Sequence, residues 1–474
     1  MLDVRNPRTG ETDHRIRPVT AAEMREIAAA SRAAQPEWQA RGFEGRSEAL
    51  RRFADLLESE GQPVIDALST DTGRARIARL EVAGAVASLR GWAASAGALM
   101  PSETWVQGRS NPQFKHRNDY VAYALVGVIS PWNFPVTLSF IDTIPALMAG
   151  ACVIVKPSEV TPRFADALMP LVERAGFADI LTFVQGAGET GAALVDVADC
   201  VCFTGSVETG RKVAVQAAGR LIPAMLELGG KDPLIVAPGA DLEAAARLAL
   251  RSSVLATGQA CQSIERVYVQ ADDHDAFLSA LKSEAEAVQL NRQDIGRGHL
   301  GPFIDARQAR VVIGQIEDAV AKGAQVVTGG ELEGGSEGSR GHWLRPTVLA
   351  DVTHDMNVMR DETFGPVIPV MAYRDVDEAV ALANDTAFGL SAAVFAADIP
   401  AAEAIAERLH AGAISLQDAA LTGQYFEAGK QSFGVSGLGP SRMGADGLLR
   451  FFRKRAFIAN TGAPLTIGDF AEDG

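Results

Sequence analysis

The sequence has 474 residues, of which 47% are hydrophobic and 22% are charged, and its formal net charge is −15. This length suits about three domains, and the composition is that of a globular chain with a large core. The excess of acidic residues argues against nucleic acid or an anionic membrane as the main partner, because both attract basic surfaces.

The four cysteines are too few for a disulfide framework, and none belongs to a CxxC pair. With only seven histidines in the chain, we expect no zinc site and no other metal. Cys152, Cys200 and Cys202 lie in strand-like runs and are interpreted as small buried side chains. This cysteine usage favours a reducing, cytoplasmic location.

The N-terminal third is expected to be helical. Residues 1–15 are charged from position 3 and lack an apolar run, which predicts no signal peptide. Apolar residues recur at helical spacing in three stretches, namely 20–40, 46–60 and 76–100. The polar, partly alternating stretch 103–123 then predicts an exposed hairpin.

One segment resembles a membrane-spanning helix. Residues 121–141 form a run of 21 residues without a charged side chain, which is long enough to cross a bilayer. Pro131, Asn133 and Pro135 at its centre argue against a spanning helix, since each disturbs or hydrates a helix there. We expect a buried strand, a loop and a helix instead, and no membrane as a partner.

From residue 123 onward, short β-branched runs alternate with helical stretches, which is typical of a doubly wound parallel sheet. The expected strands lie within 123–130, 151–158, 180–185, 199–206 and 222–230. The alternation begins again with a helix over 240–258 and strands within 265–270, 324–330, 366–373 and 413–418. The sequence therefore predicts two α/β lobes that meet near residue 230.

Two glycine-containing turns could border a nucleotide. Gly186–Gly191 fits the GxGxxG pattern between a strand and a helix, although Glu189 would place a carboxylate near a pyrophosphate. The next turn, 203–212, offers Gly205 and the N–H groups of a helix that begins near Ser206. Plain turns remain the alternative for both.

Three further features could carry chemistry. Lys156 and Glu159 leave the carboxyl end of a strand, where parallel sheets bind ligands, although a surface ion pair is as good an explanation. Glu227 lies between two leucines, where a carboxylate is costly unless it is paired or functional. Cys261, in a loop 34 residues later, could be a nucleophile with this carboxylate as its base, but the spacing alone is weak evidence.

Seven motifs occur in the order and spacing of the aldehyde dehydrogenase superfamily, which the chain resembles from NPRTGE almost to its end. They are SPWNFP, KPSE, FTGSVETG, LELGGK, GQACQS, DETFGPV and NDTAFGLS. The resemblance implies a Rossmann-like cofactor lobe, a second α/β catalytic lobe and a small β oligomerisation arm. It implies an NAD(P)-dependent enzyme of the non-acylating type that oxidises a small aldehyde to a carboxylic acid.

By this resemblance, Cys261 attacks the aldehyde carbon and Asn133 helps to bind the resulting oxyanion. Glu227 activates the water that hydrolyses the thioester, whereas branches that transfer the acyl group to coenzyme A lack this glutamate. The resemblance assigns the remaining site residues to the cofactor. These are Ser130, Pro131, Trp132, Lys156, Ser158, Glu159, Gly188, Gly205, Ser206, Glu362 and Phe364. Because Glu159 would repel a 2′-phosphate, NAD is favoured, with NADP possible.

The resemblance also implies domain bounds: 1–102 with 124–229 for NAD binding, 230–425 for catalysis, and 103–123 with 426–474 for the arm and C-terminal segment. The arm suggests a homodimer or homotetramer. The chain departs from the family pattern at GKQSFGVSGLGP and at QDAALTGQYFEAG, so the substrate mouth is not assigned.

Two alternative functions stay open at this stage. One is an acylating dehydrogenase or thioester hydrolase that uses the same cysteine, and the other is a silent scaffold that keeps only the fold and the oligomer. The roles of Gln262 and Ser263, beside the cysteine, are also open.

Overall fold

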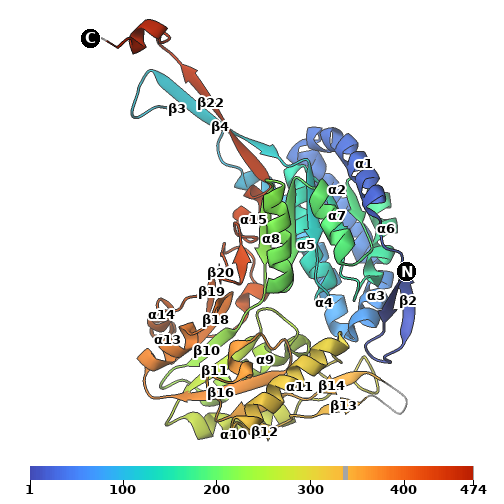
Figure 1. Cartoon of the computed structure of the whole chain (residues 1–474), viewed down its shortest axis with the longest axis vertical. Coiled ribbons are helices and arrows are strands. Elements are labelled where there is room, and N and C mark those ends of the chain that lie inside the picture. The colour runs from blue at the N-terminus through green and yellow to red at the C-terminus, as the bar shows by residue number, and fades with distance from the viewer. Residues whose placement is uncertain (335–339, 473–474) are drawn as a thin grey trace.

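The computed structural model describes residues 1–334 and 340–472, so parts of the expected catalytic lobe and C-terminal segment, 335–339 and 473–474, lie outside the described residues. Two α/β lobes lie one above the other in Figure 1, and a narrow β arm projects from the upper lobe. The arm carries the C-terminal part of the chain away from the body. This is the expected mixed α/β architecture.

The upper lobe is built on a six-stranded sheet in the order β21-β9-β8-β5-β6-β7. Its strands are β5 (Leu125–Ile129), β6 (Cys152–Lys156), β7 (Leu181–Phe183), β8 (Cys200–Thr204), β9 (Ala224–Glu227) and β21 (Gly437–Leu438). All neighbours are parallel except β21 and β9. Because β6 and β8 lie on opposite sides of β5, the strand order reverses between β5 and β8, which is where open α/β sheets bind ligands.

Helices flank this sheet (Figure 1). They are α1 (Ala21–Ala40), α2 (Gly42–Glu60), α3 (Gln62–Thr72), α4 (Ala75–Ser95), η1 (Ala96–Leu99), α5 (Pro135–Ala149), α6 (Arg163–Arg174), α7 (Gly188–Val197) and α8 (Val207–Gly219). Helix α1 begins at a capping box in which Thr20 and Glu23 bind each other's backbone N–H groups. Cys152, Cys200 and Cys202 are fully buried in the core of this lobe, as expected.

The apolar segment 121–141 forms the end of one strand, then β5, a loop and the first half of α5, as the prolines predict. Pro135 opens α5, and Gly150 ends it with a left-handed φ of 103°. In the described part of the chain, no helix combines the length and the apolar character needed to cross a membrane.

The lower lobe has a seven-stranded sheet in the order β12-β15-β16-β11-β10-β18-β19. Its strands are β10 (Asp232–Val236), β11 (Ile264–Gln270), β12 (Gln325–Thr328), β15 (Thr347–Ala350), β16 (Val367–Tyr373), β18 (Ser391–Phe395) and β19 (Ala413–Leu416). Since β9 belongs to the first sheet and β10 to the second, the chain passes between lobes at Leu228–Lys231. The sequence predicts this crossing near residue 230.

The remaining elements of the lower lobe are helices and short strands. They are α9 (Leu242–Val254), η2 (Leu255–Gly258), α10 (His274–Glu286), α11 (Ala306–Ala321), α12 (Asn357–Arg360), α13 (Val376–Asn384), α14 (Ile399–Ala406), η3 (Leu421–Gly423), β13 (Leu332–Gly334), β14 (His342–Leu344), β17 (Phe388–Gly389) and β20 (Phe433–Gly434). The helix expected over 240–258 is too long by two residues at its start and by four at its end. It ends at Val254 because Ala256, Thr257 and Gly258 have left-handed backbones.

The arm is a three-stranded antiparallel sheet in the order β22-β4-β3. It joins β3 (Val106–Gln107) and β4 (Phe114–Ala122) to β22 (Phe452–Asn460), after α15 (Asp446–Leu449) and before η4 (Ile467–Phe470). The predicted hairpin is therefore confirmed. The expectation of a wholly helical N-terminal third is wrong, because β1 (Leu2–Arg5) and β2 (Thr12–Ile16) form a hairpin before α1.

Candidate active site

The loops that follow β5 and β8 lie together at the point where the strand order reverses. Ile129 is in register with Lys156 on one side and with Phe203 on the other, so these carboxyl ends share one edge. Ser130–Asn133 and Gly205–Ser206 follow at once. Ser130 is buried, and Pro131 and Trp132 are half-buried. With Lys156, seven of the predicted site residues therefore lie at the same edge of the sheet. They are Ser130, Pro131, Trp132, Asn133, Lys156, Gly205 and Ser206.

Two helix N-termini open onto this edge. Helix α7 begins at Gly188 with no side-chain cap, and α8 begins after Ser206, whose hydroxyl accepts from Thr209 N. The first N–H groups of each helix therefore point outward without intrahelical partners. A Cβ at Gly205 would lie 2.6 Å from the Phe203 ring, so a larger residue there would require that ring to move. This donor set suits the diphosphate of a dinucleotide.

Lys156 and Glu159 form an ion pair, with 3.1 Å between Nζ and Oε2. The Lys156 side chain is only 6% exposed, whereas Glu159 is 39% exposed, so the pair is not simply a surface pair. Ser158, between them, is buried, and its Oγ accepts from Val160 N. A half-exposed carboxylate beside a buried ammonium can bind sugar hydroxyl groups from both sides.

Cys261 follows a strained turn. Ala256, Thr257 and Gly258 have φ values of 57°, 63° and 66° in succession, a conformation that is costly for a β-branched residue such as Thr257. At Gly258, a Cβ would lie 2.2 Å from the Gly365 carbonyl oxygen. The turn therefore packs closely on the 362–366 loop, and it places Cys261 between the η2 turn and β11.

Asn133 is 3% exposed and bound to the cysteine loop. Its Nδ2 donates to the Gln259 carbonyl at 2.9 Å, which fixes the direction of the amide. A side-chain amide has two N–H donors, so one remains for another acceptor. The structure thus joins the predicted oxyanion donor to the loop of the predicted nucleophile.

Arg74, which the sequence analysis does not single out, links the same two loops. It is 4% exposed and donates to the carbonyl oxygens of Ala256, at 3.1 Å, and of Asn133. Glu81 lies nearby and accepts from the backbone N–H groups of Val136 and Thr137 at the start of α5. The sequence around Arg74 gives no indication of this role, because its two partners lie 59 and 182 residues away along the chain.

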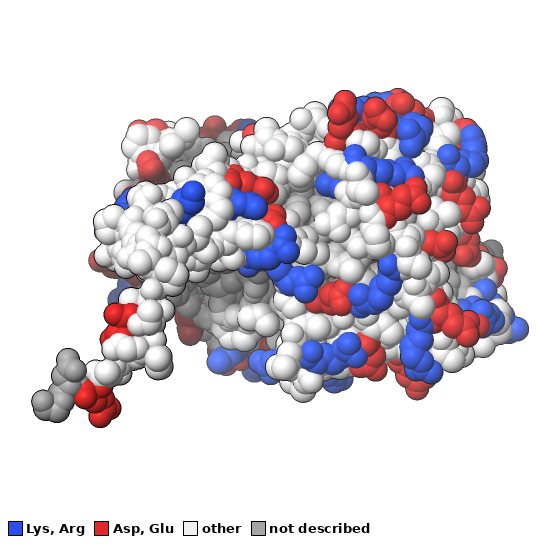
Figure 2. Space-filling view, turned by 90° about the horizontal axis from the view of Figure 1, so that it is seen from above, with Lys and Arg blue, Asp and Glu red and all other residues white. Residues whose placement is uncertain are grey.

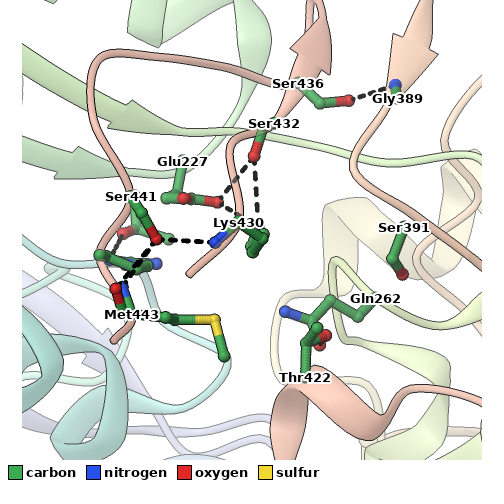
Figure 3. A network of polar contacts seen from close by, with 12 residues as sticks. Glu227, Gln262, Gly389, Ser391, Thr422, Lys430, Ser432, Ser436, Ser441 and Met443 are labelled. Carbon is green, nitrogen blue, oxygen red and sulfur yellow. Dashed lines mark hydrogen bonds and ion pairs between the residues drawn. The ribbon is translucent and has the colours of Figure 1, made fainter. Parts of the chain in front are cut away.

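Glu227 is the last residue of β9 and forms an ion pair. From the sequence, a carboxylate between two leucines is expected to be either paired or functional, and the structure shows that it is paired. Its Oε2 lies 3.1 Å from Lys430 Nζ and accepts a hydrogen bond from Ser432 Oγ at 3.1 Å. Figure 3 shows these side chains together, with Ser441 beside Lys430. Lys430 comes from the departing GKQSFGVSGLGP stretch, so the resemblance gave it no role.

Acidic groups surround Cys261. Burial raises the pKa of its thiol to about 12, with Glu362, Glu227 and Asp232 acting in the same direction and Lys430 opposing them. Burial also raises the pKa of Glu362 to about 8 and that of Asp232 to about 7. In this structure the thiol is therefore protonated at neutral pH, and its reaction as a nucleophile requires removal of a proton.

Glu362 and Phe364 lie across the crossing between lobes. Glu362 Oε1 accepts from Gly230 N at 3.2 Å, and the Phe364 ring meets Trp132 edge-on with centroids 5.3 Å apart. Phe364 has a left-handed φ of 52°, and its N–H donates to buried Glu265 at 2.8 Å. Glu265 also binds Lys231 at 2.8 Å, so a buried ion pair holds this loop.

Gln262 and Ser263 now have distinct surroundings. Ser263 is buried, and its hydroxyl donates to the Gly258 carbonyl at 3.3 Å, which closes the cysteine turn. Gln262 Oε1 accepts from Thr422 Oγ1 on the opposite side of the site from Glu227 (Figure 3). Of the two, only Gln262 is partly exposed. In the described ranges, no group of three or more His, Cys, Asp or Glu could hold a metal ion.

Comparison with known proteins supports the same assignment. A model of the aldehyde dehydrogenase family matches residues 1–456. The chain belongs to the aldehyde dehydrogenase family. It is thus an oxidoreductase of the class that uses a nicotinamide cofactor, and the resemblance stated from its motifs is confirmed. The roles of individual residues remain predictions.

Three similar proteins show how far the likeness extends. A Mycobacterium ulcerans protein named as an NADP+-dependent succinate-semialdehyde dehydrogenase is 39% identical, over 92% of this chain and 84% of its own. The structure described as aldehyde dehydrogenase PutA from Anabaena variabilis has a TM-score of 0.94 and 47% identity, covering 98% of both chains. Betaine aldehyde dehydrogenase from Staphylococcus aureus, in complex with NAD+, has a TM-score of 0.91 and 27% identity, covering 98% of this chain and 92% of its own.

Proposed function

We propose that this aldehyde dehydrogenase oxidises an aldehyde to the carboxylic acid with NAD+, through a covalent bond to Cys261 and hydrolysis by water. The observation that carries the proposal is the convergence of three groups. Asn133 binds the loop of Cys261 at Gln259, and Glu227 acts electrostatically on the thiol from the other lobe. A nucleophile, an oxyanion donor and a carboxylate base therefore share one site.

The first half of the reaction forms a carbon–sulfur bond. The Cys261 thiol releases its proton to solvent, and the thiolate sulfur attacks the carbonyl carbon to give a thiohemiacetal oxyanion. The free N–H of the Asn133 amide and the backbone N–H of Cys261 stabilise that oxyanion. Bound NAD+ would supply the acceptor for the hydride that leaves the former carbonyl carbon. The C–O double bond then re-forms, and a thioester is left on Cys261.

The second half breaks the carbon–sulfur bond. Glu227 removes a proton from water, and the resulting hydroxide attacks the thioester carbon. The tetrahedral intermediate collapses, the carbon–sulfur bond breaks, and the carboxylic acid and the Cys261 thiolate are released, while Glu227 gives its proton back to solvent. A carboxylate in the position of Glu227 favours water over coenzyme A as the acyl acceptor, because it can act as a general base.

The adenine ribose and the diphosphate of the cofactor would be held by residues of the first lobe. The N-termini of α7 and α8, with Gly188, Gly205 and Ser206, suit the diphosphate, and Lys156 and Glu159 suit the adenine ribose. The carboxylate of Glu159 favours NAD over NADP, because it would repel a 2′-phosphate. Glu362 and Phe364 border the position of the nicotinamide ribose and ring.

We also propose that the enzyme is a cytoplasmic homodimer or homotetramer. The four cysteines are free, which suits a reducing compartment. The arm exposes apolar side chains far from the body, among them Trp105, Ile458 and Phe470. In Figure 2 the arm at the left shows large uncharged areas with a few basic groups, and the C-terminal turn at the lower left carries acidic groups, whereas the helices on the right carry charges of both signs throughout. Such an arm suits contact with a second copy.

The test is NADH formation by purified protein with aliphatic, aromatic and semialdehyde substrates, each with NAD+ or NADP+. We expect NADH with at least one aldehyde and none with Cys261→Ser, while Ser253→Ala, a small change at another buried position, keeps the activity. Turnover of an aryl ester or an acyl-CoA without any aldehyde oxidation would instead support the thioesterase or acylating alternative.

A further inference from the structure

The two oxygens of Glu227 have different surroundings. Oε2 is bound by both Lys430 Nζ and Ser432 Oγ, each at 3.1 Å. Among residues 1–334 and 340–472, no hydrogen bond to Oε1 is found. A carboxylate held through one oxygen cannot rotate freely, so its second oxygen keeps a fixed direction. In Figure 3 Lys430 and Ser432 both meet Glu227 from the C-terminal segment.

Backbone bonds fix that segment relative to Glu227. Strand β21 pairs with β9, with Gly437 opposite Glu227, and Leu228 N donates to the Ser436 carbonyl at 2.8 Å. Lys430 N donates to Ser441 Oγ at 2.9 Å. The side chain of Lys430 is 5% exposed, and a lysine is seldom so deeply buried without a partner.

Lys430 also differs from the other charged groups around the thiol. Cys261 is affected by Glu227, Glu362 and Asp232, which disfavour a thiolate, and by Lys430, which favours it. A second cation, Arg442, faces Glu227, but its guanidinium is already bound to Asp142 and Thr204. Among the described residues, Lys430 is therefore a cation that can both bind Glu227 and act electrostatically on Cys261.

We propose that Lys430 is a positioning residue of this reaction: it holds Glu227 by one oxygen, so that the other faces the thioester, and its charge stabilises the Cys261 thiolate. The inference rests on the proposed function for the first role only. The second role concerns the free enzyme and can be measured without turnover. Ser432 shares the first role and lacks the second, because it binds Glu227 but carries no charge.

The test compares Lys430→Gln, Lys430→Arg and Ser432→Ala, each checked for a native thermal transition. The rate at which iodoacetamide alkylates Cys261 is measured at several pH values, with Cys261→Ser as the blank. The pH values are chosen below the pKa of the thiol, where the alkylation rate rises tenfold per pH unit. We expect Lys430→Gln to be alkylated roughly tenfold more slowly at each pH, which equals a shift of about one pKa unit. Lys430→Arg and Ser432→Ala should follow the wild type.

Turnover gives the second readout. With an aldehyde and NAD+, Ser432→Ala should keep the first-turnover burst of NADH, and Lys430→Gln should keep its amplitude but form it more slowly, because less thiolate is present. Both variants should lose roughly tenfold or more in steady-state rate. Wild-type alkylation profiles in folded Lys430→Gln, or equal losses in Lys430→Arg and Lys430→Gln, would overturn the inference. If Lys430→Gln does not fold, an unchanged steady state in Ser432→Ala overturns the positioning role.

The two proposals fail in different ways. A wild-type protein that oxidises no aldehyde refutes the proposed function, while a slower alkylation of Lys430→Gln still supports the electrostatic role. An active wild type with an unaltered Lys430→Gln variant refutes the inference alone.

Discussion

At the scale of single residues, the account depends on two separable steps at Cys261. We predict that Glu227→Gln leaves the first-turnover burst of NADH and lowers the steady-state rate by about 100-fold or more, because a general base contributes about that much. Rapid-mixing absorbance with one aldehyde and NAD+ measures both phases. Glu26→Gln, an exposed change on α1, is the control and should be active. A lost burst with a normal steady state would contradict the assignment.

The proposed preference for NAD over NADP depends on one residue, Glu159. We predict that Glu159→Gln lowers the ratio of kcat/KM for NAD+ to that for NADP+ by roughly tenfold, because the 2′-phosphate no longer meets a carboxylate. Steady-state kinetics with both cofactors measure this ratio. A lower rate with both cofactors and an unchanged ratio would show that Glu159 does not discriminate between them.

Residue-level prediction from sequence succeeds where the chemistry is local and fails where partners are distant. Cys261, Asn133 and Glu227 could be proposed because each lies in a short motif. Lys430 and Arg74 could not, because their contacts span 203 and 182 residues and no local period marks them. The pairing of Glu227 was open for the same reason, since its partner lies in the stretch that departs from the family pattern.

At the scale of elements, the η2 turn positions the nucleophile at a cost in backbone strain. We predict that Gly258→Ala lowers the free energy of unfolding by about 2–4 kcal/mol, because alanine at φ 66° is strained and its Cβ would meet the Gly365 carbonyl at 2.2 Å. Gly314→Ala is the matched control, since nothing lies within 4 Å of its Cβ position in α11. It should gain up to about 1 kcal/mol.

Urea unfolding of the two glycine variants measures both changes. Equal stabilities would mean that the turn adapts to a side chain, and the constraint that we place on the cysteine loop would then be absent.

The start of α5 carries a pH-dependent contact. Burial raises the pKa of Glu81 to about 7, so the native state holds this proton between pH 4.5 and 7 while the unfolded chain releases it. The contribution of Glu81 to stability is therefore complete below pH 4.5 and is lost as the pH rises through 7. We predict that the free energy of unfolding of Glu81→Gln falls less steeply between pH 4.5 and 7 than that of the wild type, by up to about 1.4 kcal/mol per pH unit.

Urea unfolding at several pH values between 4.5 and 7.5 tests the Glu81 prediction, with the exposed Glu26→Gln as control. Parallel stability curves for wild type and Glu81→Gln would contradict it.

Among the elements themselves, alternating strands and helices were predictable because burial on both faces gives strands a continuous apolar pattern. The end of α9 was not, since Ala256 and Thr257 are ordinary helix residues that tertiary contacts hold in a left-handed turn. The hairpin of β1 and β2 was missed because its nine residues are mostly polar and charged.

At the scale of the whole molecule, the projecting arm predicts self-association. We expect wild-type protein to have at least twice the mass of one chain by light scattering. Ile458→Glu, at a position 72% exposed on β22, should shift the equilibrium towards the monomer, because a buried carboxylate would be unpaired. Val320→Glu, on the exposed face of α11, is the control. A wild-type monomer would refute this role for the arm.

The central claim is a covalent acyl intermediate on Cys261, and peptide mass spectrometry of acid-quenched Glu227→Gln measures it most directly. After incubation with a substrate aldehyde and NAD+, we predict the acyl mass on the peptide that contains Cys261, and no such mass in Glu227→Gln with Cys261→Ser. NADH formed at the wild-type first-turnover rate without any acyl group on Cys261, or with the acyl group on another residue, would contradict the account.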